Sequence, residues 1–251
     1  DPWGASAGAT AAAAGEEPAG WLKKAGPGPL SDPIVVTMAL RDEARGKDLP
    51  IRVTCPGGVG PFPVIVWSHG ARGTKEAYGP VVEHWASHGY ACIQADHSDS
   101  RAFGEKEPNS PALFADWKNR PRDIAFILDS LDAIGARAPA VKGKFDRGKI
   151  GVGGHSYGAH AAQLVAGATT TEGPAGKRES HADPRPKAFL LLSPQGIGQG
   201  AAGLDEASGR ELSRPFIVIT GTKDLGRTGA DGAWGTEPHR HAPRPDKYLM
   251  G

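Results

Sequence analysis

The chain has 251 residues, of which 39% are hydrophobic and 23% charged, a composition typical of one globular domain with a substantial core. The formal net charge is +1, so no strong field of either sign points to nucleic acid or an anionic membrane surface as a partner. Because no apolar run approaches about 18 residues, we expect no transmembrane helix.

The first thirty residues differ in composition from the rest of the chain. They contain an alanine run at 11–14 and the tetrad Gly26-Pro27-Gly28-Pro29, and the chain begins with Asp1 rather than Met. Such a stretch often follows a cleaved signal peptide. We therefore expect residues 1–30 to be a flexible leader of a secreted or periplasmic protein, although an arbitrary chain boundary would explain them equally well. Residues 31–251 are expected to form a single domain.

The two cysteines, Cys55 and Cys92, could pair, and the sequence does not decide between the thiol and disulfide forms. Cys92 lies in the apolar run Tyr90–Ile93 and is interpreted as a buried structural thiol. No cysteine spacing indicates a metal site, and no cofactor is expected.

Short apolar segments predict a series of strands along the chain. They lie at Ile34–Met38, Ile51–Thr54, Val64–Trp67, Tyr90–Ala95, Lys149–Gly153, Ala188–Leu192 and Phe216–Thr220, and a last one begins at Lys247. The first two flank a turn at 45–48 and predict an edge hairpin. Helical spacing predicts helices over 75–88, from Pro121 to Ile134, and over 157–167. This alternation predicts an α/β fold: a mostly parallel central sheet with an antiparallel edge hairpin and helices on both faces.

The strongest local signal is Gly154-His155-Ser156-Tyr157-Gly158, which follows a predicted strand and opens a predicted helix. A serine on such a sharp turn stands clear of the backbone, and the flanking glycines avoid collisions with neighbouring elements. The helix N-terminus adds partial positive charge near the reacting oxygen. Ser156 is therefore the candidate catalytic nucleophile; the alternative is an ordinary glycine-rich turn.

A second segment, Trp67-Ser68-His69-Gly70-Ala71-Arg72-Gly73, directly follows the third predicted strand. Acyl transfer places negative charge on a carbonyl oxygen, which two backbone N–H groups must stabilise. Tyr157, the residue after the nucleophile, supplies one candidate for this oxyanion hole, and Ala71 supplies the other. The alternative is a tight turn with a packed histidine, and His69 itself is interpreted as a structural residue of the loop.

The candidate acid follows the strand Phe216–Thr220, at Gly221-Thr222-Lys223-Asp224. In this order of elements the acid lies between the serine and the histidine of a triad, and its carboxylate holds the imidazole in the required tautomer. Asp224 is the first candidate and Asp205 the reserve, while a plain turn-forming aspartate is the alternative.

No histidine among the nine occupies the expected place after the last strand. His239 and His241 follow the acid but precede the final strand. We expect the base beyond Gly251, in a C-terminal segment that the sequence lacks. A substitute role for His239 or His241, or a chain without a base, are the alternatives. The pair His239-x-His241 has no further ligand cluster to make it a metal site.

Taken in order, these motifs resemble a bacterial family of α/β-hydrolases related to platelet-activating factor acetylhydrolases, dienelactone hydrolases and chlorophyllases. The matching stretches are 40–45 through 51–53, 66–70, 84–90, 153–159 and 219–224, which together cover nearly the whole chain after residue 30. The resemblance implies an α/β-hydrolase fold, a Ser–Asp–His triad and no metal or organic cofactor. In the acetylhydrolases the acid follows the preceding strand, near Ser193 here, and Ser193-Pro194-Gln195 offers no carboxylate.

The predicted function is hydrolysis of a small-molecule or polymeric carboxylic ester through an acyl-enzyme on Ser156. A serine peptidase of the same fold and a non-catalytic binding protein are the alternatives. The polar stretches 96–119 and 169–186 are expected to overhang the ligand crevice, with Phe103, Phe114 and Trp117 as pocket walls or as packing. The ester itself and the oligomeric state are not readable from the sequence.

Overall fold

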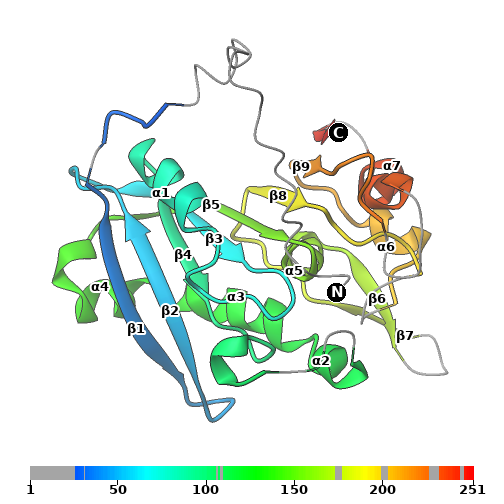
Figure 1. Cartoon of the computed structure of the whole chain (residues 1–251), viewed down its shortest axis with the longest axis horizontal. Helices are drawn as coiled ribbons and strands as arrows, with labels where there is room; N and C mark the ends of the chain where they lie inside the picture. The colour runs from blue at the N-terminus through cyan, green and yellow to red at the C-terminus, as the bar shows by residue number, and fades with distance from the viewer. Residues whose placement is uncertain are drawn as a thin grey trace, which may run out of the picture.

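A computed structural model describes residues 26–30, 32–105, 107, 110–172, 177–198, 203–225, 232–243 and 246–251 of the chain. Its centre is an eight-stranded sheet with the spatial order β1-β2-β4-β3-β5-β8-β9-β10 (Figure 1). The strands are β1 (Ile34–Asp42), β2 (Lys47–Cys55), β3 (Phe62–Ser68), β4 (Ala91–Ala95), β5 (Phe145–His155), β8 (Ala188–Leu192), β9 (Phe216–Ile219) and β10 (Lys247–Met250).

The direction of the strands confirms the predicted fold class. The hairpin β1–β2 is antiparallel and β2 pairs antiparallel with β4, whereas all pairs from β4 to β10 are parallel. Parallel neighbours require crossovers, and helices supply most of them. The carboxyl ends of β3, β5, β8, β9 and β10 therefore lie at one end of the sheet, where the predicted site residues follow their strands.

Helices surround the sheet. They are α1 (Gly79–Ser87), η2 (Arg101–Phe103), α2 (Pro111–Ala115), α3 (Asn119–Asp129), α4 (Leu131–Arg137), η3 (Pro139–Val141), α5 (Tyr157–Ala166), α6 (Glu206–Arg210), η4 (Gly232–Thr236) and α7 (Glu237–His241). Apolar residues of α3, α4 and α5 join those of the central strands in one core, in which Val66, Ile124 and Leu164 are almost completely buried. Burial of such side chains is the main stabilising contribution to a fold of this kind.

Several elements differ from the sequence predictions in their bounds. The first helix begins at Gly79 rather than Lys75, because Tyr78 adopts a left-handed conformation and Pro80 opens the helix. The helix predicted from Pro121 to Ile134 begins at Asn119 and is broken into α3 and α4 at Ser130. The stretch 169–186 contains a hairpin that was not predicted, β6 (Thr169–Glu172) with β7 (Lys177–Ser180).

Residues 1–25 of the predicted leader lie outside the described residues. Residues 26–30 lie along the end of α1, where the amide of Gly28 donates to Ser87 Oγ at 2.8 Å and the amide of Leu30 to the Ser87 carbonyl at 3.0 Å. The two cysteines are free, buried thiols. Burial raises the pKa of Cys55 to about 11 and raises that of Cys92 further, consistent with the structural role predicted for Cys92.

Candidate active site

Ser156 lies on the turn between β5 and α5 and has a strained backbone. Its dihedral angles are φ 52° and ψ −114°, a region that non-glycine residues rarely adopt. The turn is held from both sides: the Ser156 amide donates to the Leu192 carbonyl at 2.9 Å, and the His160 amide donates to the Ser156 carbonyl at 3.0 Å. Strain that the surroundings enforce in this way is typical of functional positions.

The glycines of the motif allow neighbouring elements to approach the turn closely. A Cβ atom at Gly154 would collide with the backbone of Gly158, and one at Gly158 would collide with the carbonyl of Ser68. The start of α5 therefore lies directly against the loop that follows β3. Only glycine at these two positions permits that contact.

The loop after β3 places Ala71 beside Tyr157. Ala71 packs against the small buried cluster of Leu113, Phe114 and Tyr157. Among the described residues, the Ala71 amide has no hydrogen-bond acceptor. Tyr157 is the first residue of α5, and the backbone N–H groups of a first helical turn point along the helix axis, beyond its N-terminal end. The structure thus brings Ser156 and both predicted oxyanion residues to one place.

His69 is a buried residue of this loop, as predicted. Its Nδ1 lies 2.6 Å from the Gly70 carbonyl oxygen, and its Nε2 accepts a hydrogen bond from the His97 amide at 3.3 Å. Burial, followed by the positive charge of Arg120, holds the pKa of His69 well below its usual value. Both ring nitrogens are occupied, so His69 is not available as a base.

Asp224 lies in the turn that follows β9. Its Oδ2 accepts hydrogen bonds from Ser193 Oγ (2.6 Å), Thr220 Oγ1 (3.1 Å) and the Gly221 amide (3.3 Å). Burial would raise the pKa of this carboxyl, but the bonds from Ser193, Gly221 and Thr220 hold it below its usual value. Among the described residues, Oδ1 accepts no hydrogen bond. This oxygen can therefore accept an imidazole N–H.

Asp224 and the nucleophile turn lie at the same end of the sheet. Asp224 and His155, the residue before Ser156, influence each other's pKa through their charges. Burial nevertheless keeps the pKa of His155 below its usual value. His155 Nδ1 lies 2.6 Å from the Tyr78 hydroxyl and 3.1 Å from where a Cβ at Gly70 would be, so this nitrogen faces the loop His69–Gly73, called the oxyanion loop below.

The structure places none of the nine histidines against Asp224 by a hydrogen bond. His69, His97 and His160 are buried, His84 and His88 lie at the end of α1, and His181 packs against Trp117. His239 and His241 lie on α7, where His241 contacts Gly209 of α6. The predicted location of the base beyond Gly251 is not tested and stays a prediction.

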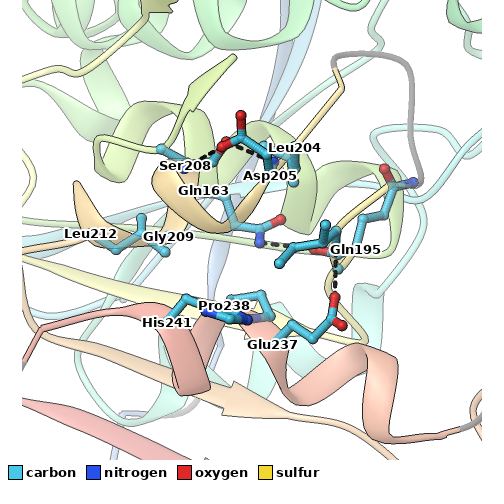
Figure 2. A pocket seen from close by; sticks show the side chains of 13 residues that line it. Gln163, Gln195, Leu204, Asp205, Ser208, Gly209, Leu212, Glu237, Pro238 and His241 are labelled. Atoms are coloured by element: carbon cyan, nitrogen blue, oxygen red, sulfur yellow. Dashed lines mark hydrogen bonds between the residues drawn. The ribbon is translucent and has the colours of Figure 1, made fainter. Parts of the chain in front are cut away.

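The reserve acid, Asp205, has a structural role. It caps α6 by accepting from the Ser208 amide at 2.9 Å and pairs with Arg178 at 2.5 Å. The nearby cavity in Figure 2 lies between α5, α6 and α7 and has a volume of about 20 Å³, enough for about one water molecule. Gln163 Nε2 donates to the Gln195 carbonyl beside it. This cavity is too small to bind a substrate.

A larger hollow lies next to the acid turn. It has a volume of about 370 Å³ and is lined by Thr220, Gly221, Thr222, Gly232, Ala233, Thr236, Leu249 and Gly251. Because β10 pairs in parallel with β9, Met250 lies opposite Ile219 and Gly251 lies beside Thr220. The chain at Gly251 is thus directed to the end of the sheet that carries Asp224.

Part of the stretch 96–119 packs against the start of α5, and its predicted position over a ligand crevice stays a prediction. Phe114 contacts the Tyr157 ring edge-on, with centroids 4.9 Å apart, and Trp117 packs against His160 and His181. Phe103, in contrast, is 53% exposed and belongs to neither contact.

Sequence reasoning missed four side chains that shape this site. Tyr78 and Ser193 hold His155 and Asp224, and the buried pair Arg120 and Asp99 holds the oxyanion loop. Charged residues are rarely buried unless paired, so the sequence alone predicts Arg120 and Asp99 to be surface residues.

Within the described ranges, no group of three or more His, Cys, Asp or Glu side chains is placed to hold a metal ion. The same residues include no helix with the length and apolar character needed to cross a membrane.

The sheet order and the serine on a strained strand-to-helix turn define the fold of an α/β-hydrolase. Solved structures agree. A protein designated a dienelactone hydrolase from Klebsiella pneumoniae is 16% identical, with a TM-score of 0.57 over 86% of this chain and 85% of that one. A cold-adapted esterase from an Arctic intertidal metagenomic library is 17% identical, with a TM-score of 0.59 over 86% and 82% of the two chains.

Within this fold the chain belongs to the chlorophyllase family, because the family's sequence model, described as chlorophyllase, matches residues 32–172, more than half of the chain. Chlorophyllase-1 of Arabidopsis thaliana is 41% identical over 54 residues, which are 22% of this chain and only 17% of that protein. The predicted resemblance to chlorophyllases and dienelactone hydrolases is confirmed at the level of family and fold. The bacterial origin stays a prediction.

Proposed function

We propose that the protein hydrolyses carboxylic esters, with Ser156 as the nucleophile. The observation that carries the proposal is the strained Ser156 turn packed against a loop whose Ala71 amide has no acceptor among the described residues. A hydroxyl at this position can attack a carbonyl carbon while the Ala71 and Tyr157 amides stabilise the developing oxyanion. Family membership and esterases of the same fold support this reaction class.

The reaction would proceed in two steps. A base takes the proton of Ser156 as its oxygen bonds to the ester carbon, and the alcohol leaves with that proton. Water then attacks the acyl-enzyme: its OH group bonds to the acyl carbon, its other proton passes through the base to the serine oxygen, and the acid is released. Asp224, fixed by Ser193, Thr220 and Gly221, would hold the base and stabilise its charged form.

The proposed base is a histidine that follows Gly251. The parallel pairing of β10 with β9 supports this position, because it directs the chain toward Asp224 and the hollow of about 370 Å³ beside it. An imidazole there could donate to Asp224 Oδ1 and face Ser156. The peptidase alternative uses the same machinery and differs only in substrate.

The test is the Ser156→Ala variant of the full-length protein, assayed on p-nitrophenyl acetate and butyrate. We expect turnover to fall by about 10⁴-fold or more. Ser180→Ala, at an exposed serine of β7, is the matched control and should retain wild-type turnover.

A fluorophosphonate probe separates an enzyme from a binding protein on the same scaffold. We expect stoichiometric labelling of wild type and Ser180→Ala, and none of Ser156→Ala. A folded wild type that neither turns over esters nor reacts with the probe would refute the proposal. Peptide anilides measured in parallel would reveal a peptidase, if they are cleaved faster than the esters.

A further inference from the structure

Two charged side chains, Arg120 and Asp99, are buried next to the oxyanion loop. Arg120 of α3 is 1% exposed, and Asp99 is 3% exposed. The guanidinium donates two hydrogen bonds to the carboxylate: Nε to Oδ1 at 2.8 Å and Nη2 to Oδ2 at 2.7 Å. Such a fork-to-fork pair fixes the orientation of both groups.

The pair holds the oxyanion loop from both sides of Ala71. Arg120 donates through Nη1 to the His69 carbonyl at 2.5 Å and through Nη2 to the Gly70 carbonyl at 3.3 Å. Asp99 Oδ2 accepts the amide of Arg72 at 3.0 Å. The peptide planes that precede and follow Ala71 are therefore both anchored to one ion pair.

The Gly70 carbonyl and the Ala71 N–H belong to the same planar peptide unit and point in opposite directions. Fixing the carbonyl therefore fixes the direction of the N–H. The Gly70 oxygen also lies 2.6 Å from His69 Nδ1 and accepts the Gly73 amide at 3.0 Å. Donors on a peptide oxygen polarise the unit, which makes its N–H a stronger donor.

The second oxyanion residue touches the same guanidinium. The centre of the Arg120 guanidinium lies 4.3 Å from the centroid of the Tyr157 ring, a cation–π contact. Arg120 thus contacts both the loop that carries Ala71 and the residue that opens α5.

We propose that Arg120 and Asp99 are positioning residues that aim and polarise the Ala71 amide and align it with Tyr157 for oxyanion stabilisation. The inference rests on the proposed ester hydrolysis and deepens it. Because both side chains are almost fully buried, we place neither against the substrate. A buried ion pair contributes little net stability compared with apolar packing, so a role in setting the loop explains its presence better than stability alone.

The experiment compares Arg120→Lys and Asp99→Asn with wild type, again in the full-length protein. Lysine keeps the positive charge but lacks the planar guanidinium that hydrogen-bonds to Asp99 and to two carbonyl groups at the same time. Asparagine keeps the size of Asp99 but loses its negative charge. We expect kcat to fall by about 10- to 100-fold, with KM changed by less than about threefold, because the weakened interaction acts in the transition state.

A trifluoromethyl ketone analogue of the ester provides a second readout, since the hemiketal that it forms with the serine oxygen carries an oxyanion. Its inhibition constant should rise in parallel with the loss of kcat/KM. The matched control is Arg185→Gln. Arg185 pairs with Asp183 and Asp129 at 2.5 Å and bonds to the Ala125 carbonyl of the same helix α3, away from the loop. The Arg185→Gln variant should have a lower thermal unfolding midpoint and an unchanged kcat.

Hydrogen exchange of the Arg72 and Gly73 amides tests positioning without activity. We expect faster exchange at these two amides in Arg120→Lys, with β5 amides unchanged. Unchanged kcat and unchanged exchange in the folded variants, or a kcat loss in Arg185→Gln of the same size, would overturn the inference. A wild type without turnover would refute the proposed function instead, and the exchange result alone would then decide whether the pair positions the loop.

Discussion

Two regions of very different construction flank Ser156. The oxyanion side, Ser68–Gly73 with Asp99 and Arg120, is mostly buried and is bound by a dense network of charged groups. The acid side, Ser193 with Thr220–Asp224 and the end of β10, is largely exposed around one half-buried carboxylate; the next residue, Leu225, is 73% exposed.

The difference follows from what each region must do. Oxyanion donors act only if they already point at the position where charge develops, because reorientation during the reaction would cost the energy they supply. The acid has only to hold an imidazole, which a carboxylate with one fixed oxygen can do. We therefore expect the oxyanion side to tolerate little structural change and the acid side to tolerate repositioning of its carboxylate.

The largest effect is expected from Asp224→Asn. The amide keeps the shape of the side chain but cannot stabilise a charged imidazole, so kcat should fall by about 10⁴-fold with little change in folding stability. Measurement of kcat and of the unfolding midpoint on one preparation checks both parts. A loss smaller than about tenfold would remove Asp224 from the mechanism.

The tolerance of the acid side can be tested in the same background. Ser193 Oγ lies 2.6 Å from Asp224 Oδ2, so a carboxylate introduced at 193 would occupy nearly the same place. We expect Ser193→Asp combined with Asp224→Asn to recover about 10- to 100-fold of the lost kcat. Ser193→Asn in that background is the matched control and should recover nothing. Equal turnover of the two double variants would contradict the idea of a movable acid.

A pair of glycines extends the comparison to stability. A Cβ at Gly158 would collide with backbone atoms of Ser68 and His69, whereas a Cβ at Gly221 would meet no atom within 4 Å. We expect Gly158→Ala to cost about 3 kcal/mol or more in the free energy of unfolding, or to prevent folding. Gly221→Ala should change it by less than about 0.5 kcal/mol. Urea unfolding of both variants measures these changes. Similar losses of unfolding free energy in the two variants would contradict the expected difference between the regions.

The sequence predicted those parts of the site that depend on local pattern. Ser156 and Tyr157 follow from a glycine-flanked turn between a strand and a helix, and Ala71 from a glycine loop after a buried strand. The structure brings these three residues together and places Asp224 at the same end of the sheet. The edge hairpin and the parallel strands were predicted because their apolar runs are local too.

The parts that were not predicted depend on contacts between distant residues. Arg120 and Asp99 are 21 positions apart and look like solvated charges until the fold buries them together. The break at Ser130 interrupts a continuous apolar pattern without a glycine or proline to mark it. The β6–β7 hairpin is polar, and Arg178 of β7 pairs with Asp205, 27 positions away. No periodicity in the sequence carries such information.

The smallest effect concerns the response to acid of His160, a buried residue that stacks on the oxyanion residue Tyr157. His160 of α5 is 1% exposed, and burial, followed by the charge of Arg120, lowers its pKa to about 3. The folded protein therefore keeps this ring neutral at a pH where the unfolded chain, with a pKa of about 6.5, binds a proton. Stability should fall as the pH drops below about 6.5, by up to about 1.4 kcal/mol per pH unit for this residue.

The variant His160→Phe keeps an aromatic ring beside Tyr157 and Trp117 but cannot titrate. We expect it to reduce the slope of unfolding free energy against pH between 5 and 6 by about one proton. Aspartates such as Asp99, whose pKa is lowered by its pairing with Arg120 despite burial, are ionised in both states over this range and do not contribute to the slope. An unchanged slope in His160→Phe, measured by urea unfolding at several pH values, would mean that the acid sensitivity arises from other groups, among them His69 and His97, whose pKa values burial also lowers.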